Sequence, residues 1–152
     1  MAGPTLTDAI QDYLREIYKL GLDGERVSVS ALAAALGVSS ASASAMVKKL
    51  AALDLAEHRP YGGVALTSAG ERVALEIIRH HRLLELYLAE TLGLDVDDVH
   101  VEAERLEHAI SEELEAKIDR ALGYPTHDPH GDPIPDANLR WPRGGGSALA
   151  TE

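Results

Sequence analysis

Hydrophobic residues follow a helical spacing along most of the chain. Between residues 5 and 21 they recur every three or four positions, and Gly21 provides a stop signal. Two alanine- and leucine-rich helical patterns follow, with a break at Gly37, Val38 and Ser39. Later patterns predict a long helix from residue 67 to about 92, one opening at residues 95–98, and one from residue 111 to Gly123. The chain is therefore predicted to be mainly α-helical.

The two patterns around Gly37 have the form of a helix-turn-helix. Ser30 is expected to cap the first helix, and Ser39 or Ser40 the second. Several residues are predicted to be buried: Leu32, Leu36, Val38, Val47, Leu50 and Leu53. Small and polar side chains are left near the exposed start of the second helix: Ser39, Ala41, Ser42, Ala43, Ser44 and Ala45.

Residues 55–67 contain two short strand-like runs on either side of Pro60-Tyr61-Gly62-Gly63, which predicts a β-hairpin with Arg59 near its tip. The helix pair alone fits either ordinary packing or DNA binding. The hairpin that follows favours a winged helix-turn-helix. Contact with DNA is then expected, because serine hydroxyls, helix N-terminal amides and basic side chains all bind phosphates. The predicted DNA-contacting residues are Ser39, Ser40, Ala41, Ser42, Ser44, Lys48, Lys49 and Arg59.

A second kind of chemistry lies in the segment HVEAERLEH. In a helix, four of its side chains share one stripe: His100, Glu104, Glu107 and His108. A neighbouring apolar stripe is predicted to face the core: Val99, Ala103, Leu106 and Ile110. Carboxylates and imidazoles within one turn can bind a divalent cation, although a solvated charged face has the same composition. His81 and Glu85, four residues apart, also share a helix face.

The composition also differs between the half of the chain with the predicted DNA contacts and the half with the candidate metal ligands. The 152 residues are 45% hydrophobic, which suffices for one domain or two small ones, and the absence of cysteine excludes thiolate metal sites. Residues 1–75 hold seven Lys/Arg and eight Asp/Glu, whereas residues 76–152 hold seven and seventeen. This asymmetry indicates a near-neutral module joined to an acidic one that gains from binding cations. No apolar run reaches the length of a membrane span, so a cytoplasmic protein without a membrane partner is expected.

The chain from Tyr124 onward holds five of the seven prolines and is predicted to be an extended arm. Four of its side chains are of metal-ligand type: His127, Asp128, His130 and Asp132. In so flexible a setting we interpret them as part of a solvated loop rather than as a metal site. The final GGGSALATE has the composition of a linker.

Several motifs together resemble the diphtheria toxin repressor family between Asp12 and Pro135: DYLREIY, HRLLE, GLDVDDVH, EAERLEH and PHGDPIP. The resemblance implies a winged helix-turn-helix DNA-binding domain over residues 1–72. An α-helical metal-binding and dimerisation domain is expected over residues 73–124, and a Pro/Gly-rich arm over residues 125–152. The SH3-like third domain of many members is expected to be absent.

The resemblance also implies two ligand sets. The primary set would be Asp12, Glu104, Glu107 and His108, and the ancillary set His81, Glu85 and His100. The iron-sensing branch typically has methionine and cysteine at the positions of Asp12 and Glu104, whereas the manganese-sensing branch has carboxylates. Hard oxygen ligands favour Mn(II), with Fe(II) as the alternative. Arg15 stands where two-ion manganese regulators carry a further glutamate, so the implied site is a hybrid.

The implied function is a repressor of manganese or iron homeostasis that binds a palindromic double-stranded DNA operator as a metal-activated homodimer, with no small organic ligand. The alternatives are an Fe(II)-sensing repressor of iron uptake and a winged-helix dimer without metal control. A metal-dependent hydrolase is less favoured, because beyond the ligands themselves the sequence offers no nucleophile or base. The chain is therefore expected not to be an enzyme.

Overall fold

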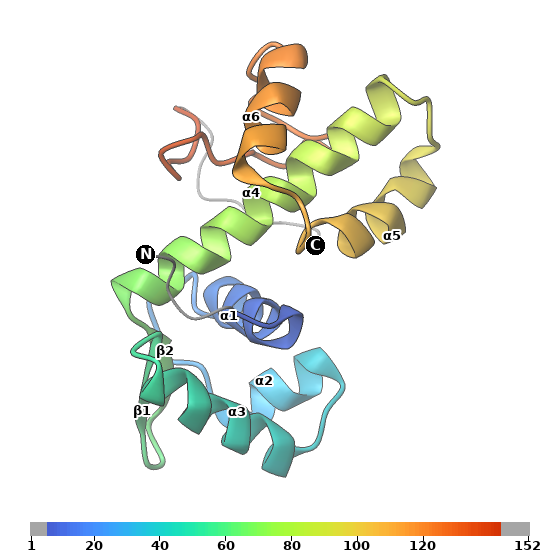
Figure 1. The fold of residues 1–152 in the computed structure, drawn as a ribbon. Helices are drawn as coiled ribbons and strands as arrows, with labels where there is room; N and C mark the ends of the chain where they lie inside the picture. Colours follow the sequence, from blue (N-terminus) through green and yellow to red (C-terminus); the bar gives the residue numbers. More distant parts are fainter. Residues whose placement is uncertain (1–5, 144–152) are drawn as a thin grey trace. The chain divides into compact units, whose positions relative to one another are not determined.

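The computed structural model describes residues 6–143 and divides into two compact units, residues 1–74 and 75–152 (Figure 1). The first unit contains α1 (Asp8–Leu20), α2 (Val29–Leu36), α3 (Ser40–Ala52), β1 (Ala56–Arg59), β2 (Gly63–Leu66) and the start of α4 (Ser68–Glu90). The second contains the rest of α4, α5 (Val96–Leu106) and α6 (Glu112–Ala121). The prediction of a mainly helical chain with an N-terminal winged helix-turn-helix is confirmed.

The first unit is built around the apolar face of α1. Ile10, Leu14 and Ile17, three or four residues apart, are at most 2% exposed and pack with Leu32 of α2 and Val47 of α3. The predicted first helix is confirmed, with Thr7 as its N-cap and Gly21 as its C-cap. This core holds the helix-turn-helix in place.

Helices α2 and α3 meet at a bend of 111°, as a helix-turn-helix requires. Gly37 ends α2 with a φ of 67°, a left-handed conformation that glycine adopts at little cost. The side chain of Ser39 accepts a hydrogen bond from the amide of Ser42, which confirms Ser39 as the N-cap of α3. The structure differs from the expectations for this pair of helices at the cap of α2 and in the burial of some side chains.

The cap of α2 is Ser28 rather than Ser30, because Val27 is held extended by two backbone hydrogen bonds to Val64 and the helix begins directly after it. Val38 is 37% exposed rather than buried, because it follows the left-handed Gly37 and so leaves the helical stripe. Leu36 and Leu53 were also expected to be buried, and both are only partly buried; Leu53 is the C-cap of α3.

Strands β1 and β2 form the predicted hairpin, in which Ala56 pairs with Leu66 and Arg59 with Gly63. Gly63 has a φ of 76°, and a Cβ there would lie 2.5 Å from the carbonyl oxygen of Val27. Glycine is therefore required where the hairpin is joined to the segment before α2. Tyr61 lies fully exposed at the tip.

In the second unit, Leu84 of α4, Ala103 of α5 and Ile118 of α6 form one apolar cluster. The proline-rich segment after α6 packs against α4 as well, since Ile134 is 1% exposed and contacts Leu83 and Leu86. The expectation of a solvated loop here was wrong. The segment packs against α4 because buried arginines of α4 donate hydrogen bonds to the carbonyl oxygens of its prolines. The predicted linker GGGSALATE lies outside the described residues.

Two hydrogen bonds from arginines of α4 to proline carbonyl oxygens are short and direct. Arg82 Nη1 donates to the carbonyl of Pro133 at 2.6 Å, and Arg79 Nη1 donates to the carbonyl of Pro135 at 2.9 Å. Proline lacks an N–H group but keeps a strong acceptor, so a proline-rich segment can still be fixed through its carbonyl oxygens.

No single described helix has the length and apolar character needed to cross a membrane; only α2 and α3 taken together pass that test, across their bend of 111°.

Candidate metal centre and nucleic-acid interface

Three of the predicted ligands come together within the second unit. His81 and Glu85 lie one turn apart on α4, and His100 lies on α5. One ligand atom from each lies within 4.8 Å of the other two. His81 Nε2 is 3.1 Å from His100 Nδ1 and 3.4 Å from Glu85 Oε1. The structure thus brings together the three residues that the resemblance assigns to the ancillary set.

The outer nitrogens of both imidazoles face carboxylates. His81 Nδ1 lies 2.5 Å from Glu107 Oε2, and His100 Nε2 lies 3.2 Å from Glu104 Oε1. An ionised carboxylate only accepts hydrogen bonds, so these contacts place the imidazole protons on the outer nitrogens. In the neutral rings, the inner nitrogens then direct lone pairs toward each other and toward Glu85. Carboxylates orient metal-binding histidines in this way.

Glu85 is the most unusual side chain of the group. It is 0% exposed, and neither of its carboxylate oxygens has a hydrogen-bond partner among the described residues. A buried carboxylate without such partners is costly unless a positive charge compensates it. A divalent cation would supply that charge, and the surrounding oxygen and nitrogen donors are those that Mn(II) and Fe(II) accept. The residues present therefore fit a cation.

A second trio also includes Glu85. Its other members are Asp128 and His130, from the segment after α6. One ligand atom from each of the three residues lies within 4.8 Å of the other two. Both residues are of metal-ligand type in the sequence, but they were interpreted there as part of a solvated loop. The signal that could have identified them is the spacing of Asp128, His130 and Gly131 in DPHGD, which is compatible with a tight turn that presents side chains in one direction.

The predicted primary set is distributed over both units. Asp12 lies on α1, where Arg15 Nη2 contacts its carboxylate at 3.3 Å. Glu107 is 1% exposed and lies beside His108, whose Nε2 is 3.4 Å from Glu107 Oε1. Glu104 is on α5 and contacts His100. Its carboxylate is about half exposed.

The single helical stripe from His100 to His108 is interrupted. Helix α5 ends at Leu106, Glu107 is its C-cap, and His108 lies in the turn beyond. Leu106 is 42% exposed rather than buried, whereas Val99 and Ala103 are fully buried as predicted. The spacing that places side chains on one helix face applies only up to the residue where the helix ends.

A buried ionic cluster adjoins this region. Arg79 Nη2 donates to Asp119 at 2.8 Å, the Arg79 guanidinium also contacts Glu115, and His80 Nε2 lies 2.5 Å from Glu115. Burial lowers the pKa of His80, but the Glu115 carboxylate and the Glu107 carbonyl outweigh it and raise the pKa overall. Burial likewise raises the pKa of Glu115, but His80 and Arg79 outweigh it and lower the pKa overall.

The first unit presents the predicted DNA-contacting side chains at the start of α3. Ser39, Ser40, Ala41 and Ser42 are exposed there, and Ser44 is half-buried. Ala43, which was expected near the exposed start of the helix, is instead fully buried, because it faces the core of the unit. Lys48 and Lys49 lie exposed further along α3, and Arg59 is exposed on the hairpin. These positions are compatible with contact to a nucleic acid.

Arg26 holds the hairpin in place, a role that the sequence did not indicate. Its guanidinium donates to the carbonyl oxygens of Gly62 at 2.9 Å, Glu57 at 2.8 Å and Gly63 at 3.1 Å. Because these contacts cross more than thirty residues, no local pattern could have predicted them.

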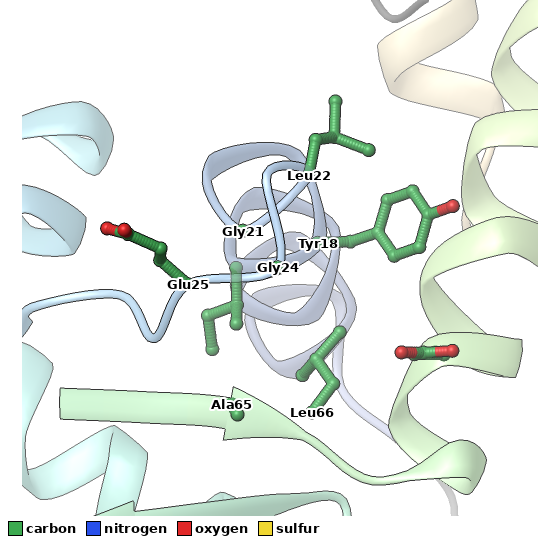
Figure 2. Close-up of a pocket in the computed structure, with 9 residues that line it drawn as sticks. Tyr18, Gly21, Leu22, Gly24, Glu25, Ala65 and Leu66 are labelled. Carbon is green, nitrogen blue, oxygen red and sulfur yellow. The ribbon is translucent and has the colours of Figure 1, made fainter. Parts of the chain in front are cut away.

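A pocket in the first unit does not coincide with the predicted sites. It lies at the C-terminal end of α1, where Tyr18, Leu22 and Glu25 project around Gly21 and Gly24 and β2 contributes Leu66 (Figure 2). Its described lining residues include two carboxylates, Glu25 and Glu71, and no histidine. The pocket therefore lacks the ligand chemistry of the groups around Glu85.

The fold defines a winged helix-turn-helix class of DNA-binding protein with an added helical unit. Comparisons with known proteins agree. A family model described as the iron dependent repressor N-terminal DNA binding domain matches residues 5–64. A second, described as the iron dependent repressor metal binding and dimerisation domain, matches residues 67–136. The chain belongs to the iron-dependent repressor family.

Individual relatives support this assignment. The iron-dependent repressor IdeR of Mycobacterium leprae is 35% identical over 130 residues, which are 86% of this chain and 56% of that protein. A solved manganese-dependent transcriptional repressor in complex with manganese is 47% identical, with a TM-score of 0.78, over 88% of this chain and 61% of the other. The manganese regulator SloR is 35% identical, with a TM-score of 0.71, over 87% of this chain and 65% of the other.

The chain spans 56% of the length of the IdeR protein named above and of the diphtheria toxin repressor of Corynebacterium efficiens. These relatives are named as repressors, and both matching family models describe domains of an iron-dependent repressor rather than of an enzyme.

Proposed function

We propose that this chain is a metal-activated DNA-binding repressor of manganese or iron homeostasis. The observation that carries the proposal is the buried Glu85 carboxylate, which faces the inner nitrogens of His81 and His100 in a chain that also contains a winged helix-turn-helix. Such a cluster gains stability when a cation binds, and DNA binding can be coupled to that gain. The place of action would be the cytoplasm, where the operator DNA lies.

The primary site would use Asp12 of the first unit together with Glu104, Glu107 and His108 of the second. A cation bound there would neutralise the clustered carboxylates and link the two units. Asp12 would exchange its contact with Arg15 for the cation. The angle between the units would then be restricted, so that α3 is held ready for the operator.

Mn(II) is the favoured cation and Fe(II) the alternative. The proposed ligands are carboxylate oxygens and imidazole nitrogens, and the chain contains no cysteine. This donor set is harder than one containing a thioether and a thiolate, and hard donors suit Mn(II). Among the relatives, the solved structure that is 47% identical is named as a manganese complex, and IdeR is named as an iron-dependent repressor.

A homodimer would form through an apolar groove of the second unit. Leu92, Leu106 and Leu114 are 42–58% exposed and line this groove, together with side chains such as Tyr87 and Ile110. Exposed apolar surface of this kind is typical of a protein interface. A two-fold dimer would present two α3 helices to a palindromic operator.

The test is footprinting on the upstream region of a metal-uptake gene, with a panel of Mn(II), Fe(II), Co(II) and Zn(II) and with a chelator. We expect a symmetric protected segment with Mn(II) or Fe(II) and none with the chelator. Protection of equal strength with the chelator would overturn the proposal of metal control, and it would leave a winged-helix dimer that responds to no metal.

A further inference from the structure

Helix α5 ends directly before two of the proposed primary ligands. Its last residue is Leu106, Glu107 is the C-cap, and His108 lies in the turn beyond. The last carbonyl groups of a helix have no amide partner within the helix, so they need donors from elsewhere. The positions of Glu107 and His108 therefore depend on what binds the end of α5.

His80 of α4 supplies such a donor. Its Nδ1 lies 3.1 Å from the carbonyl oxygen of Glu107, a residue 27 positions further along the chain. A carbonyl oxygen only accepts hydrogen bonds, so Nδ1 donates to it. This contact joins the middle of α4 to the point where α5 ends.

The other nitrogen of the His80 ring is bound by α6. His80 Nε2 lies 2.5 Å from Glu115 Oε2, and the two side chains are 13% and 12% exposed. The guanidinium of Arg79 contacts the other oxygen of Glu115 and donates to Asp119 at 2.8 Å. The imidazole is thus held at both nitrogens, and all of these contacts lie within the second unit.

We propose that His80 is a positioning residue of the primary cation site, because its bond to the Glu107 carbonyl fixes the end of α5 that carries Glu107 and His108. The proposal rests on the metal-activated function proposed above. Within residues 6–143, His80 belongs to none of the three groups of convergent ligand atoms. It acts through the backbone of Glu107, and its contact with Glu115 makes the packing of α6 on α4 part of the support of the site.

Two amide substitutions of His80 separate its two contacts. In His80→Asn the side-chain amide nitrogen takes the place of Nδ1, so the donor to Glu107 is kept and the contact with Glu115 is lost. In His80→Gln the amide nitrogen takes the place of Nε2, so the contact with Glu115 is kept and the donor to Glu107 is lost. We expect His80→Gln to lower the Mn(II) affinity of the primary site by about tenfold, the scale for loss of a group that supports a metal ligand. His80→Asn should keep the affinity of the wild type.

Calorimetry with Mn(II) on the full chain measures these affinities. The second site, formed by the ancillary set around Glu85, gives a binding event of its own, and Asp12→Ala identifies the primary event because only the primary set contains Asp12. If His80 acted only on the stability of the fold through Glu115, His80→Asn would bind more weakly than His80→Gln. That order of the two variants would overturn the proposal.

Amide hydrogen exchange of the metal-free chain gives a second reading. The amides of Glu107 and Ala109 donate to the carbonyls of Ala103 and Leu106, so their exchange reports on the end of α5. Both amides should exchange about fivefold faster in His80→Gln than in the wild type, the factor that one hydrogen bond contributes to an opening equilibrium. In His80→Asn they should exchange as in the wild type, and wild-type exchange in both variants would overturn the role of His80.

The outcomes separate this proposal from the function on which it rests. Two binding events that keep their wild-type affinities in both variants would overturn the role of His80 and leave metal control intact. Absence of any Mn(II) binding event in the wild type would overturn the proposed function itself.

Discussion

His81 touches both predicted ligand sets. Its Nδ1 lies 2.5 Å from Glu107 Oε2, and its Nε2 faces His100 and Glu85. In the proposed function, one imidazole would therefore serve as a ligand of the second site and as a support for a carboxylate of the primary site. At such positions, loss of the supporting group typically lowers metal affinity by about 10- to 100-fold.

We predict that His81→Ala weakens Mn(II) binding at both sites, each by about tenfold or more. Calorimetry with Mn(II) measures both affinities, and His58→Ala on β1 serves as the histidine control. If His81→Ala weakened only one of the two binding events, Glu107 would not depend on His81 for its position.

The sequence predicted which residues share a helix face but not which faces meet. His81 and Glu85 could be paired because four residues correspond to about one helical turn. The contact of His81 with Glu107, twenty-six residues away, depends on how α5 packs on α4 and has no local signal. Asp128 and His130 escaped prediction for the same reason, since arginine contacts to proline carbonyls hold their turn.

At the scale of elements, the helix-turn-helix followed from local signals. Gly37 and Ser39 marked the break between α2 and α3, and the hairpin followed from its glycines. The cap of α2 was predicted two residues late, because the backbone pairing of Val27 with Val64 decides where that helix begins.

Helix α3 provides a prediction about salt. Lys48→Ala should weaken binding to all DNA sequences about equally and reduce the slope of log K against log salt concentration by about one. Lys117→Ala on α6, where the side chain is also exposed, should leave the slope unchanged. Operator titrations at several salt concentrations measure the slope, and an equal slope for Lys48→Ala would exclude a phosphate contact by this lysine.

The contact between α4 and α6 provides a prediction about pH. The pKa of His80 is raised above its ordinary 6.5, so its contribution to stability is present below that value and is lost as pH rises through the raised pKa. The pKa of Glu115 is lowered below 4.5, so its contribution is present above 4.5 and is lost as pH falls through the lowered pKa. Together they stabilise the unit most between 4.5 and 6.5.

Glu115→Gln should therefore reduce the free energy of unfolding of the metal-free chain by about 2 kcal/mol near pH 6, the scale of hydrogen bonds to charged groups. The loss of stability should be smaller near pH 9, because His80 is then neutral and Glu115 keeps only its contact with Arg79. Urea unfolding at the two pH values measures it, with Glu113→Gln on the exposed face of α6 as control. An equal loss at both values would show that His80 contributes nothing.

At the scale of the whole molecule, the apolar groove of the second unit predicts self-association. Leu114→Glu would place a charge in the groove and should give a chain with a mass of 16.3 kDa, whereas the wild type should have twice that mass. Ala116→Glu, also exposed on α6 but outside the groove, should remain dimeric. Sedimentation equilibrium measures the masses, and a dimeric Leu114→Glu would move the interface elsewhere.

The measurement that tests metal control most directly is fluorescence anisotropy of labelled operator DNA, titrated with the chain in Mn(II) and in chelator. We predict that Mn(II) tightens binding by about 10- to 100-fold, the usual range of coupling between two sites. Asp12→Ala should lose this gain, and Asp8→Ala, exposed on the same helix, should keep it. Metal control would be contradicted by equal affinity of the wild type with and without Mn(II), or by an Asp12→Ala chain that responds to Mn(II) as the wild type does.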